Sequence, residues 1–274
     1  MPRNTYATLG RLVFALSLAG FGLQYVRFGH FAQGLPPIPP WTGGGEYGAY
    51  VVGLALLATS ASIAASWKGR VSAMVVGFLF LLSGVLLHTQ KLHDILYSGT
   101  SRTGALEVLG LAGAAFVLAA ELPAALHRRR AEEAIQEWAR LGCFLFAFTL
   151  VIFGLQHFWD ASFAASLIPA WLPGRLFLTY LTGVGLIAAG LSVALGIAVK
   201  LSATLLAATF FLWVAILQGP RVAAHPGNGD EWSSAFVALA MCGASLIVAG
   251  RASRQAVTPH PVRRFSASPG DGAH

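Results

Sequence analysis

One polar phrase occurs twice in this chain, each time at the end of a long apolar run: "FGLQYVRFGHF" at residues 21–31 and "FGLQHFWDASF" at residues 153–163. In both places a proline-containing segment follows, and then a tryptophan, Trp41 or Trp171. A phrase that recurs in the same setting indicates two copies of one structural unit.

The repetition extends well beyond this phrase. With an offset of 130 residues, positions 41–120 align with positions 171–250 without a gap, and 19 of the 80 pairs are identical. Before the tryptophans the offset is 132, which places Gln24 on Gln156. The sequence therefore predicts two modules fused head to tail.

The composition is that of a membrane protein. Of the 274 residues 56% are hydrophobic and 11% are charged, whereas soluble domains carry about 25% charged residues. Alternation at period two is absent, so apolar runs of about 20 residues predict membrane-spanning helices rather than barrel strands. We place eight spans near residues 8–28, 47–67, 71–89, 103–122, 138–158, 176–197, 201–218 and 233–250. The predicted fold is an all-α membrane protein in which eight transmembrane helices form a tandem parallel repeat of two four-helix bundles.

Four parts of the chain follow from this reading. The first four-helix module covers 1–122, the charged linker "PAALHRRRAEEAIQE" covers 123–137, the second module covers 138–251, and a polar tail covers 252–274. We expect the linker to form a short interfacial helix or a solvated connection, and the tail to be flexible.

The basic residues predict the orientation. With eight spans, the ends of the chain and the loops on their side of the membrane contain thirteen of the 18 Lys and Arg residues, and the other side contains five. The thirteen are Arg3, Arg11, Lys68, Arg70, Arg128, Arg129, Arg130, Arg140, Lys200, Arg251, Arg254, Arg263 and Arg264; the five are Arg27, Lys91, Arg102, Arg175 and Arg221. Because positive loops stay in the cytoplasm, we expect a multi-pass protein of the bacterial inner membrane with both termini cytoplasmic.

The remaining composition excludes two function classes. The net charge of +7 lies in short loops and forms no basic groove, which argues against nucleic acid as a partner. Cys143 and Cys242 form no C-x-x-C pair, which argues against thiol–disulfide exchange.

Three stretches resemble the DoxX-like family of bacterial membrane proteins. They are "FGLQHF" at 153–158, "LIPAWLPGRLFLTYLTGVGLIAAGLSV" at 167–193 and "DEWSSAFVALAMCGASLIVAG" at 230–250, and the first module is a more diverged copy. The resemblance implies four-helix membrane modules, some of which are subunits of quinone-linked sulfur oxidation while others associate with redox-defence enzymes. The resemblance implies quinone as the cofactor. It also implies other membrane or periplasmic subunits as partners.

The candidate catalytic residues lie at the outer ends of the spans. Gln24 and Gln156 can hydrogen-bond a quinone or an oxyanion, or else a neighbouring helix. His88 and His157 can carry the proton of a quinol, or cap a helix. Their positions are not duplicated, so a bis-histidine haem in each module is not supported, and no metal-binding motif is present.

Further candidates surround these four. If the first and third helices of each module are neighbours, Gln24, Tyr25 and His88 meet in one module, and Gln156, His157 and Gln218 meet in the other. Lys91 and Arg221 can attract an anion. Trp41, Trp171 and Tyr180 can anchor the protein at the membrane interface or line a pocket. The predicted ligand-binding set is Gln24, Tyr25, His88, Lys91, Gln156, His157, Trp171, Tyr180, Gln218 and Arg221.

Glu107 lies about one turn inside its predicted span. A charge there is costly, so we expect a partner, Arg102 or Lys91. Three functions stay open: a quinone-linked redox subunit, a structural or assembly subunit without chemistry of its own, and a small-solute transporter. The last has least support, because charges are nearly absent from the span centres.

Overall fold

The computed structural model describes residues 4–29, 45–89, 99–123 and 129–257, with the side chains at 45–46, 86–89, 99–101 and 256–257 outside the description. The described residues contain helices and no strand. The helices are α1 (Thr5–Phe28), α2 (Gly45–Ala65), α3 (Gly69–Thr89), α5 (Gly99–Glu121), α6 (Arg129–Trp159), α7 (Ala161–Ser166), α8 (Arg175–Leu195), α9 (Val199–Trp213), the π-helical η2 (Val214–Gln218), α10 (Gly219–Ala224) and α11 (Gly229–Val257).

The helices confirm the broader prediction, an all-helical chain with the helices of a multi-pass membrane protein. Seven helices are long and apolar enough to cross a bilayer, and α9, η2 and α10 together make one of them. The described side chains of α3 form a shorter apolar helix, Gly69–Val85. The eighth span and the assignment of the membrane stay predictions.

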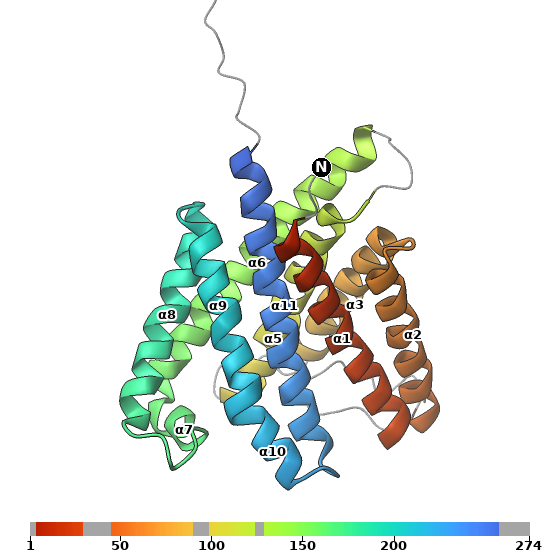
Figure 1. Cartoon of the computed structure of the whole chain (residues 1–274). Coiled ribbons are helices and arrows are strands. Elements are labelled where there is room, and N and C mark those ends of the chain that lie inside the picture. Colours follow the sequence, from red (N-terminus) through yellow and green to blue (C-terminus); the bar gives the residue numbers. More distant parts are fainter. Residues whose placement is uncertain (1–3, 30–44, 90–98, 124–128, 258–274) are drawn as a thin grey trace, which may run out of the picture.

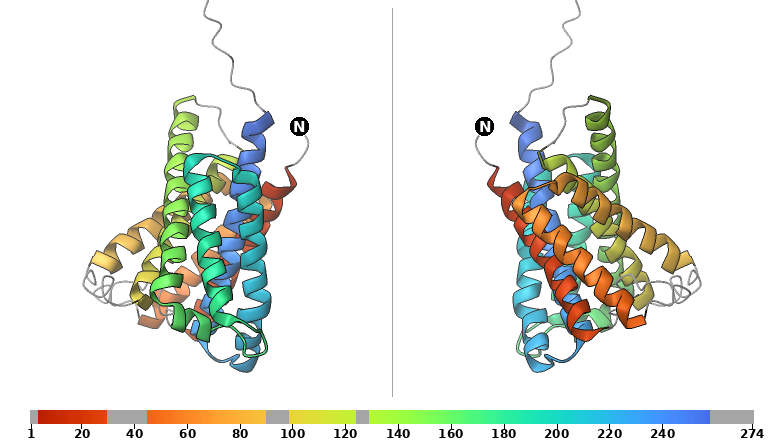
Figure 2. Two further views of the ribbon diagram at one scale, coloured as in Figure 1. Left: turned by 90° about the vertical axis from the view of Figure 1, so that its left-hand side faces the viewer. Right: turned by 90° about the vertical axis from the view of Figure 1, so that its right-hand side faces the viewer.

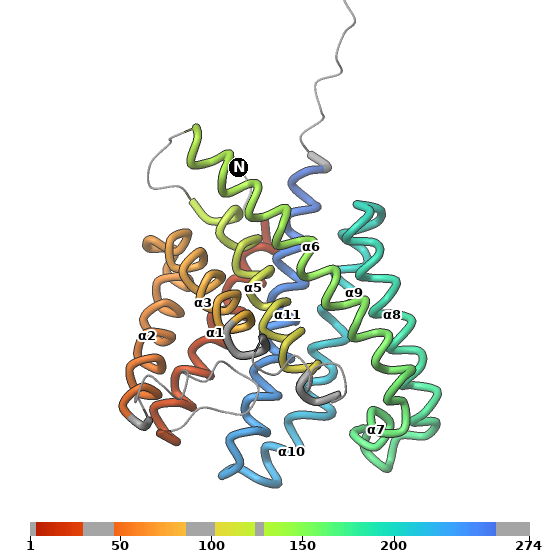
Figure 3. The backbone as a smooth tube through the Cα atoms, turned by 180° about the vertical axis from the view of Figure 1, so that it is seen from behind, coloured from red at the N-terminus to blue at the C-terminus, as the bar shows by residue number. Residues whose placement is uncertain are grey.

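Four helices form the centre of the bundle. Helix α1 packs along α11, α5 packs along α6, and α5 and α11 also touch (Figure 1). Helices α2 and α3 flank the centre on one side, against α1 and α5, while α8 and α9 flank it on the other, against α6 and α11. Seen from behind, α6 lies between α5 and α8 (Figure 3). Because α5 and α11 have neighbours all around, they are the most buried of the seven.

Glycines set the closest helix crossings. A Cβ atom on Gly113 of α5 would lie 2.5 Å from the carbonyl oxygen of Gly142 in α6. A Cβ atom on Gly243 of α11 would lie 2.7 Å from the backbone nitrogen of Phe14 and 3.0 Å from the oxygen of Gly10, both in α1. Backbones that approach this closely leave no room for any side chain, which is how small residues hold helices together in lipid.

Contacts recur at positions that the 130-residue offset pairs. The hydroxyls of Ser62 and Ser72 lie 2.7 Å apart at the α2–α3 turn, and those of Ser192 and Ser202 lie 2.7 Å apart at the α8–α9 turn. The crossings also correspond, since α1 meets α11 at Gly10 and Gly243 while α6 meets α5 at Gly142 and Gly113. In both cases the first helix of one half packs on the last helix of the other.

The charged linker differs from the expectation. Residues 129–137 form the first turns of α6 rather than a separate helix, and α6 and α11 project beyond the other helices at the same end (Figure 2). The glutamates 132, 133 and 137 follow the arginines within this segment, and Arg129 pairs with Glu133 one turn on, at 3.0 Å. Such pairs support a continuous helix outside an apolar environment.

The glycine crossings predict a matched pair of variants. Gly113→Ala should lower the apparent unfolding temperature in detergent by several degrees, because overpacking a tight contact costs about 1–3 kcal/mol. Gly185→Ala is the control, since nothing lies within 4 Å of a Cβ atom there. Equal unfolding temperatures for the two variants would contradict the α5–α6 contact.

Candidate functional site

Gln24 lies at the end of α1 and is only 5% exposed. Its Nε2 donates to the carbonyl oxygen of Gly229 at 2.8 Å and to the hydroxyl of Ser233 at 2.7 Å, both on α11. The Gly229 oxygen can only accept, so the amide orientation is determined. The other amide atom, Oε1, is buried and has no hydrogen-bond partner among the residues that the structure describes.

Gln156 makes the corresponding contact in the other half. It is 8% exposed, and its Nε2 donates to the hydroxyl of Thr103 on α5 at 3.3 Å. Thr103 and Ser233 are 130 residues apart, and Gln24 and Gln156 are 132 apart. The repeated phrase therefore places one glutamine amide at the contact of α1 with α11 and the other at the contact of α6 with α5. In each case the first helix of one half meets the last helix of the other half.

His157 faces away from Gln156, toward α8 and α9. Its Nδ1 lies 2.7 Å from the carbonyl oxygen of Phe153, and its ring stacks on Trp213 at 5.9 Å. A carbonyl only accepts, so the neutral ring carries its proton on Nδ1 and Nε2 is left with an open lone pair. Nε2 has no hydrogen bond to any residue that the structure describes.

The two predicted trios are brought together only in part. The His157–Trp213 stack makes α6 and α9 neighbours at this end, as we expected for first and third helices. Gln218 lies five residues beyond Trp213, but Gln156 points to α5 instead, and no contact joins Gln156 to Gln218 within the described ranges. Gln156 and His157 therefore point to different helices, and a shared pocket for the second trio stays a prediction.

The first trio is only partly described. Gln24 and Tyr25 are buried in α1. His88 belongs to α3, but its side chain lies outside the described residues, as do Lys91 and Trp41 entirely.

A π-helix interrupts the third helix of the second half, and sequence reasoning missed it. Residues Val214–Gln218 widen to the π form directly before Gly219 and Pro220. Pro220 has no N–H to continue the α-helical ladder, and π-bulges are frequent at functional sites. The Gly-Pro pair was the signal available. The Oε1 atom of Gln218 is buried here and accepts no hydrogen bond from the described part of the chain.

Arg102, one of the two partners expected for Glu107, is wrong. Arg102 pairs with Asp160 at 3.0 Å and lies over the ring of Trp159, so it does not pair with Glu107. Asp160 immediately follows α6, whose end lies beside Arg102, and it is a better partner because it is outside the apolar span. Glu107 has no hydrogen bond or ion pair to the described residues. Lys91, the other proposed partner, is not among them.

Arg221 also has a local partner. Its Nε lies 2.8 Å from Glu231, whose side chain is 14% exposed, so its charge is neutralised within the protein. Trp171 is exposed on the loop before α8, and Tyr180 stacks on Phe158 at 5.4 Å. These positions agree with interfacial aromatic residues and place neither ring beside His157. Among the described residues no group of three metal-ligating side chains occurs.

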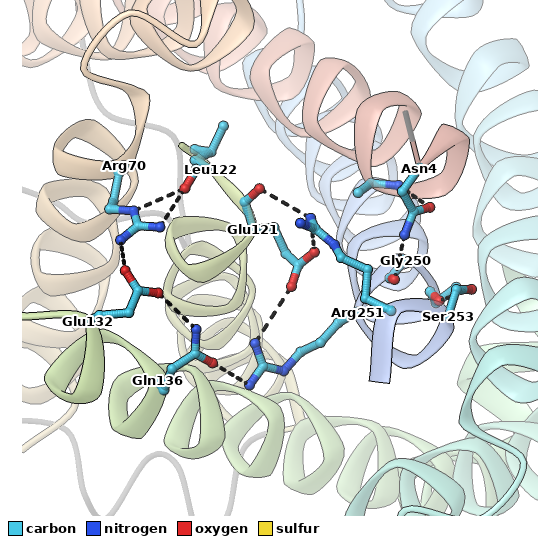
Figure 4. A network of polar contacts seen from close by, with 12 residues as sticks. Asn4, Arg70, Glu121, Leu122, Glu132, Gln136, Gly250, Arg251 and Ser253 are labelled. Atoms are coloured by element: carbon cyan, nitrogen blue, oxygen red, sulfur yellow. Dashed lines mark hydrogen bonds and ion pairs between the residues drawn. The ribbon is translucent and has the colours of Figure 1, made fainter. Parts of the chain in front are cut away.

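A second polar cluster lies at the opposite end and was not anticipated (Figure 4). The Glu121 side chain, 6% exposed at the end of α5, pairs with Arg251 and Arg254 of α11. Arg251 donates to Gln136 at 3.0 Å, and Gln136 donates to Glu132 at 3.2 Å.

Arg70 completes this cluster. It pairs with Glu132 at 2.5 Å and donates to the carbonyl oxygen of Leu122. The cluster thus ties α3, α5, α6 and α11 together where the spans end, which is a structural role. Sequence reasoning took these arginines only as topology signals.

No family model, curated protein or solved structure matches this chain.

The Gln24 contact predicts a measurable coupling. A double-mutant cycle of Gln24→Leu and Ser233→Ala should give an interaction energy of about 0.5–1.5 kcal/mol, the range for a hydrogen bond between membrane helices. Reversible unfolding in mixed detergent measures it. The control cycle combines Gln24→Leu with Ser234→Ala. The Ser234 hydroxyl donates to the backbone oxygen of Asp230 in its own helix, so this cycle should give no coupling energy. Equal couplings in the two cycles would contradict the contact.

Proposed function

We propose that this chain is a DoxX-like subunit of the bacterial inner membrane, made of two fused four-helix modules with both termini in the cytoplasm. The offset of 130 residues, or 132 before the tryptophans, supports the duplication, because identities, serine pairs and glycine crossings all follow it. The excess of basic residues at one end of the bundle supports the orientation.

The activity that we propose is quinone-linked redox chemistry at the outer ends of the helices, with His157 as the proton carrier. The observation that carries this choice is the Nδ1 contact to Phe153, which leaves Nε2 open beside the Trp213 ring. Oxidation of a quinol releases two electrons and two protons. Nε2 would accept these protons one after the other and pass each to water at the outer surface, while both electrons pass to an electron-accepting partner subunit.

Gln24 and Gln156 have a different role in this proposal. Their amides hold helices together, so they position the outer ends rather than bind the quinone. This role follows from the contacts with Gly229, Ser233 and Thr103, which occupy the amide nitrogens.

Quinone binding tests this assignment. His157→Gln should weaken binding of a short-chain ubiquinone analogue to the purified protein about tenfold, the effect of about one hydrogen bond. Equilibrium dialysis measures it, and His225→Gln, at the end of α10, is the control. Unchanged binding by the His157 variant removes this residue from the proposal. Absence of binding by the unaltered protein removes the quinone.

The second candidate is an assembly subunit without chemistry. It is favoured by the contacts that Gln24, Gln156, Arg102 and Arg221 make within the protein, since polar side chains that hold helices together serve structure. In that case the chain purified from its native membrane in mild detergent would retain stoichiometric membrane subunits and no quinone, and His157→Gln would leave the complex and its activity intact.

A further inference from the structure

An open hollow lies where α7 and the start of α8 meet. It has a volume of about 440 Å³ and is lined by Ser162, Ala165 and Ser166 of α7, by Gly174, and by Arg175, Leu176 and Phe177 of α8. The lining combines one cation and two hydroxyls with apolar side chains. None of these residues belongs to the site around His157.

In the membrane placement that we propose above, this hollow lies at the level of the lipid headgroups. The segment 160–174 connects the end of α6 to the start of α8, two helices long and apolar enough to span a bilayer (Figure 1). Exposed aromatic side chains surround it, namely Trp159 at 61%, Phe163 at 62%, Trp171 at 70% and Phe177 at 67% exposure. Tryptophan and other aromatic rings concentrate at the boundary between hydrocarbon and water.

Arg175 is the charged group of the hollow. Its guanidinium is exposed and has neither an ion pair nor a hydrogen bond to the part of the chain that the structure describes. By contrast, Arg102 and Arg221 at the same end each pair with a carboxylate. A guanidinium is well matched to the oxygens of a phosphate.

Polar groups beside Arg175 add acceptor and donor capacity. The hydroxyl of Ser166 donates to the oxygen of Phe163 and can still accept, while the Ser162 hydroxyl lines the same space. The backbone N–H groups of Arg175, Leu176 and Phe177 precede the hydrogen-bonded ladder of α8, which begins where Leu178 donates to the Gly174 carbonyl. The first N–H groups of a helix can therefore donate to a ligand.

We propose that this hollow binds the headgroup of an anionic phospholipid. The phosphate pairs with Arg175, a hydroxylated headgroup such as glycerol meets the serine hydroxyls, and the first acyl carbons lie along Leu176 and Phe177. A zwitterionic choline headgroup fits less well, because its trimethylammonium group adds a positive charge beside Arg175.

Native mass spectrometry of the full chain in mild detergent tests this site. The delipidated protein should retain one phosphatidylglycerol more tightly than phosphatidylcholine. Arg175→Gln should weaken that retention about tenfold, as expected for a charge-assisted contact. Arg27→Gln is the matched control, since Arg27 lies at the same end of the bundle and its guanidinium lies over the ring of Phe28.

A second variant tests the cavity without changing the charge. Ala165→Leu fills the hollow and should also weaken retention, with thermal unfolding confirming that the protein stays folded. Equal retention by Arg175→Gln and the unaltered protein would overturn the site. Equal retention of phosphatidylcholine would overturn the anionic preference, and displacement of the lipid by excess inorganic phosphate would show a site for free anions instead.

Discussion

Close backbone contact at glycine is the constraint on which this structure depends. In lipid no hydrophobic force draws helices together, so they adhere where small residues allow dense packing. Gly113 meets Gly142, and Gly243 meets Gly10, each with no space for a methyl group. These two crossings join the first helix of each half to the last helix of the other, so the halves interlock instead of lying side by side. The flanking pairs α2–α3 and α8–α9 then attach to a centre that both halves build.

The interlocked centre explains the position of the repeated polar phrase. Each glutamine lies near the end of its crossing, where one amide can reach a hydroxyl on the partner helix, Ser233 or Thr103. His157, which occurs in the second half alone, faces outward from that centre toward Trp213. The duplicated glutamines therefore hold helices together, whereas His157, whose place is taken by Tyr25 in the first half, is the residue to which we assign the proposed proton transfer. The glutamine amides donate hydrogen bonds to neighbouring helices, whereas Nε2 of His157 has no hydrogen bond to any described residue, which is the physical reason for choosing His157 over the glutamines as the proton carrier.

Much of the fold was predictable because apolar length and basic residues report directly on membrane helices. The partners of individual side chains were less predictable, since they depend on which helices touch. We expected Gln156, His157 and Gln218 to meet, but residues 156 and 157 are neighbours on a helix and point to different helices. We expected Glu107 to pair with Arg102 or Lys91, which are near it in sequence, but Arg102 pairs with Asp160, which is distant in sequence and lies 3.0 Å away. The cluster of Glu121 with Arg251 and Arg254 escaped notice for the same reason, because α5 and α11 belong to different halves.

Expression of the two halves as separate chains, 1–125 and 126–274, tests the interlocking most directly. If each first helix completes the other half, the two chains will co-purify in detergent when they are produced together, and each alone will aggregate or be degraded. Halves that purify separately as folded, monomeric four-helix bundles, with no affinity for each other, would contradict the account.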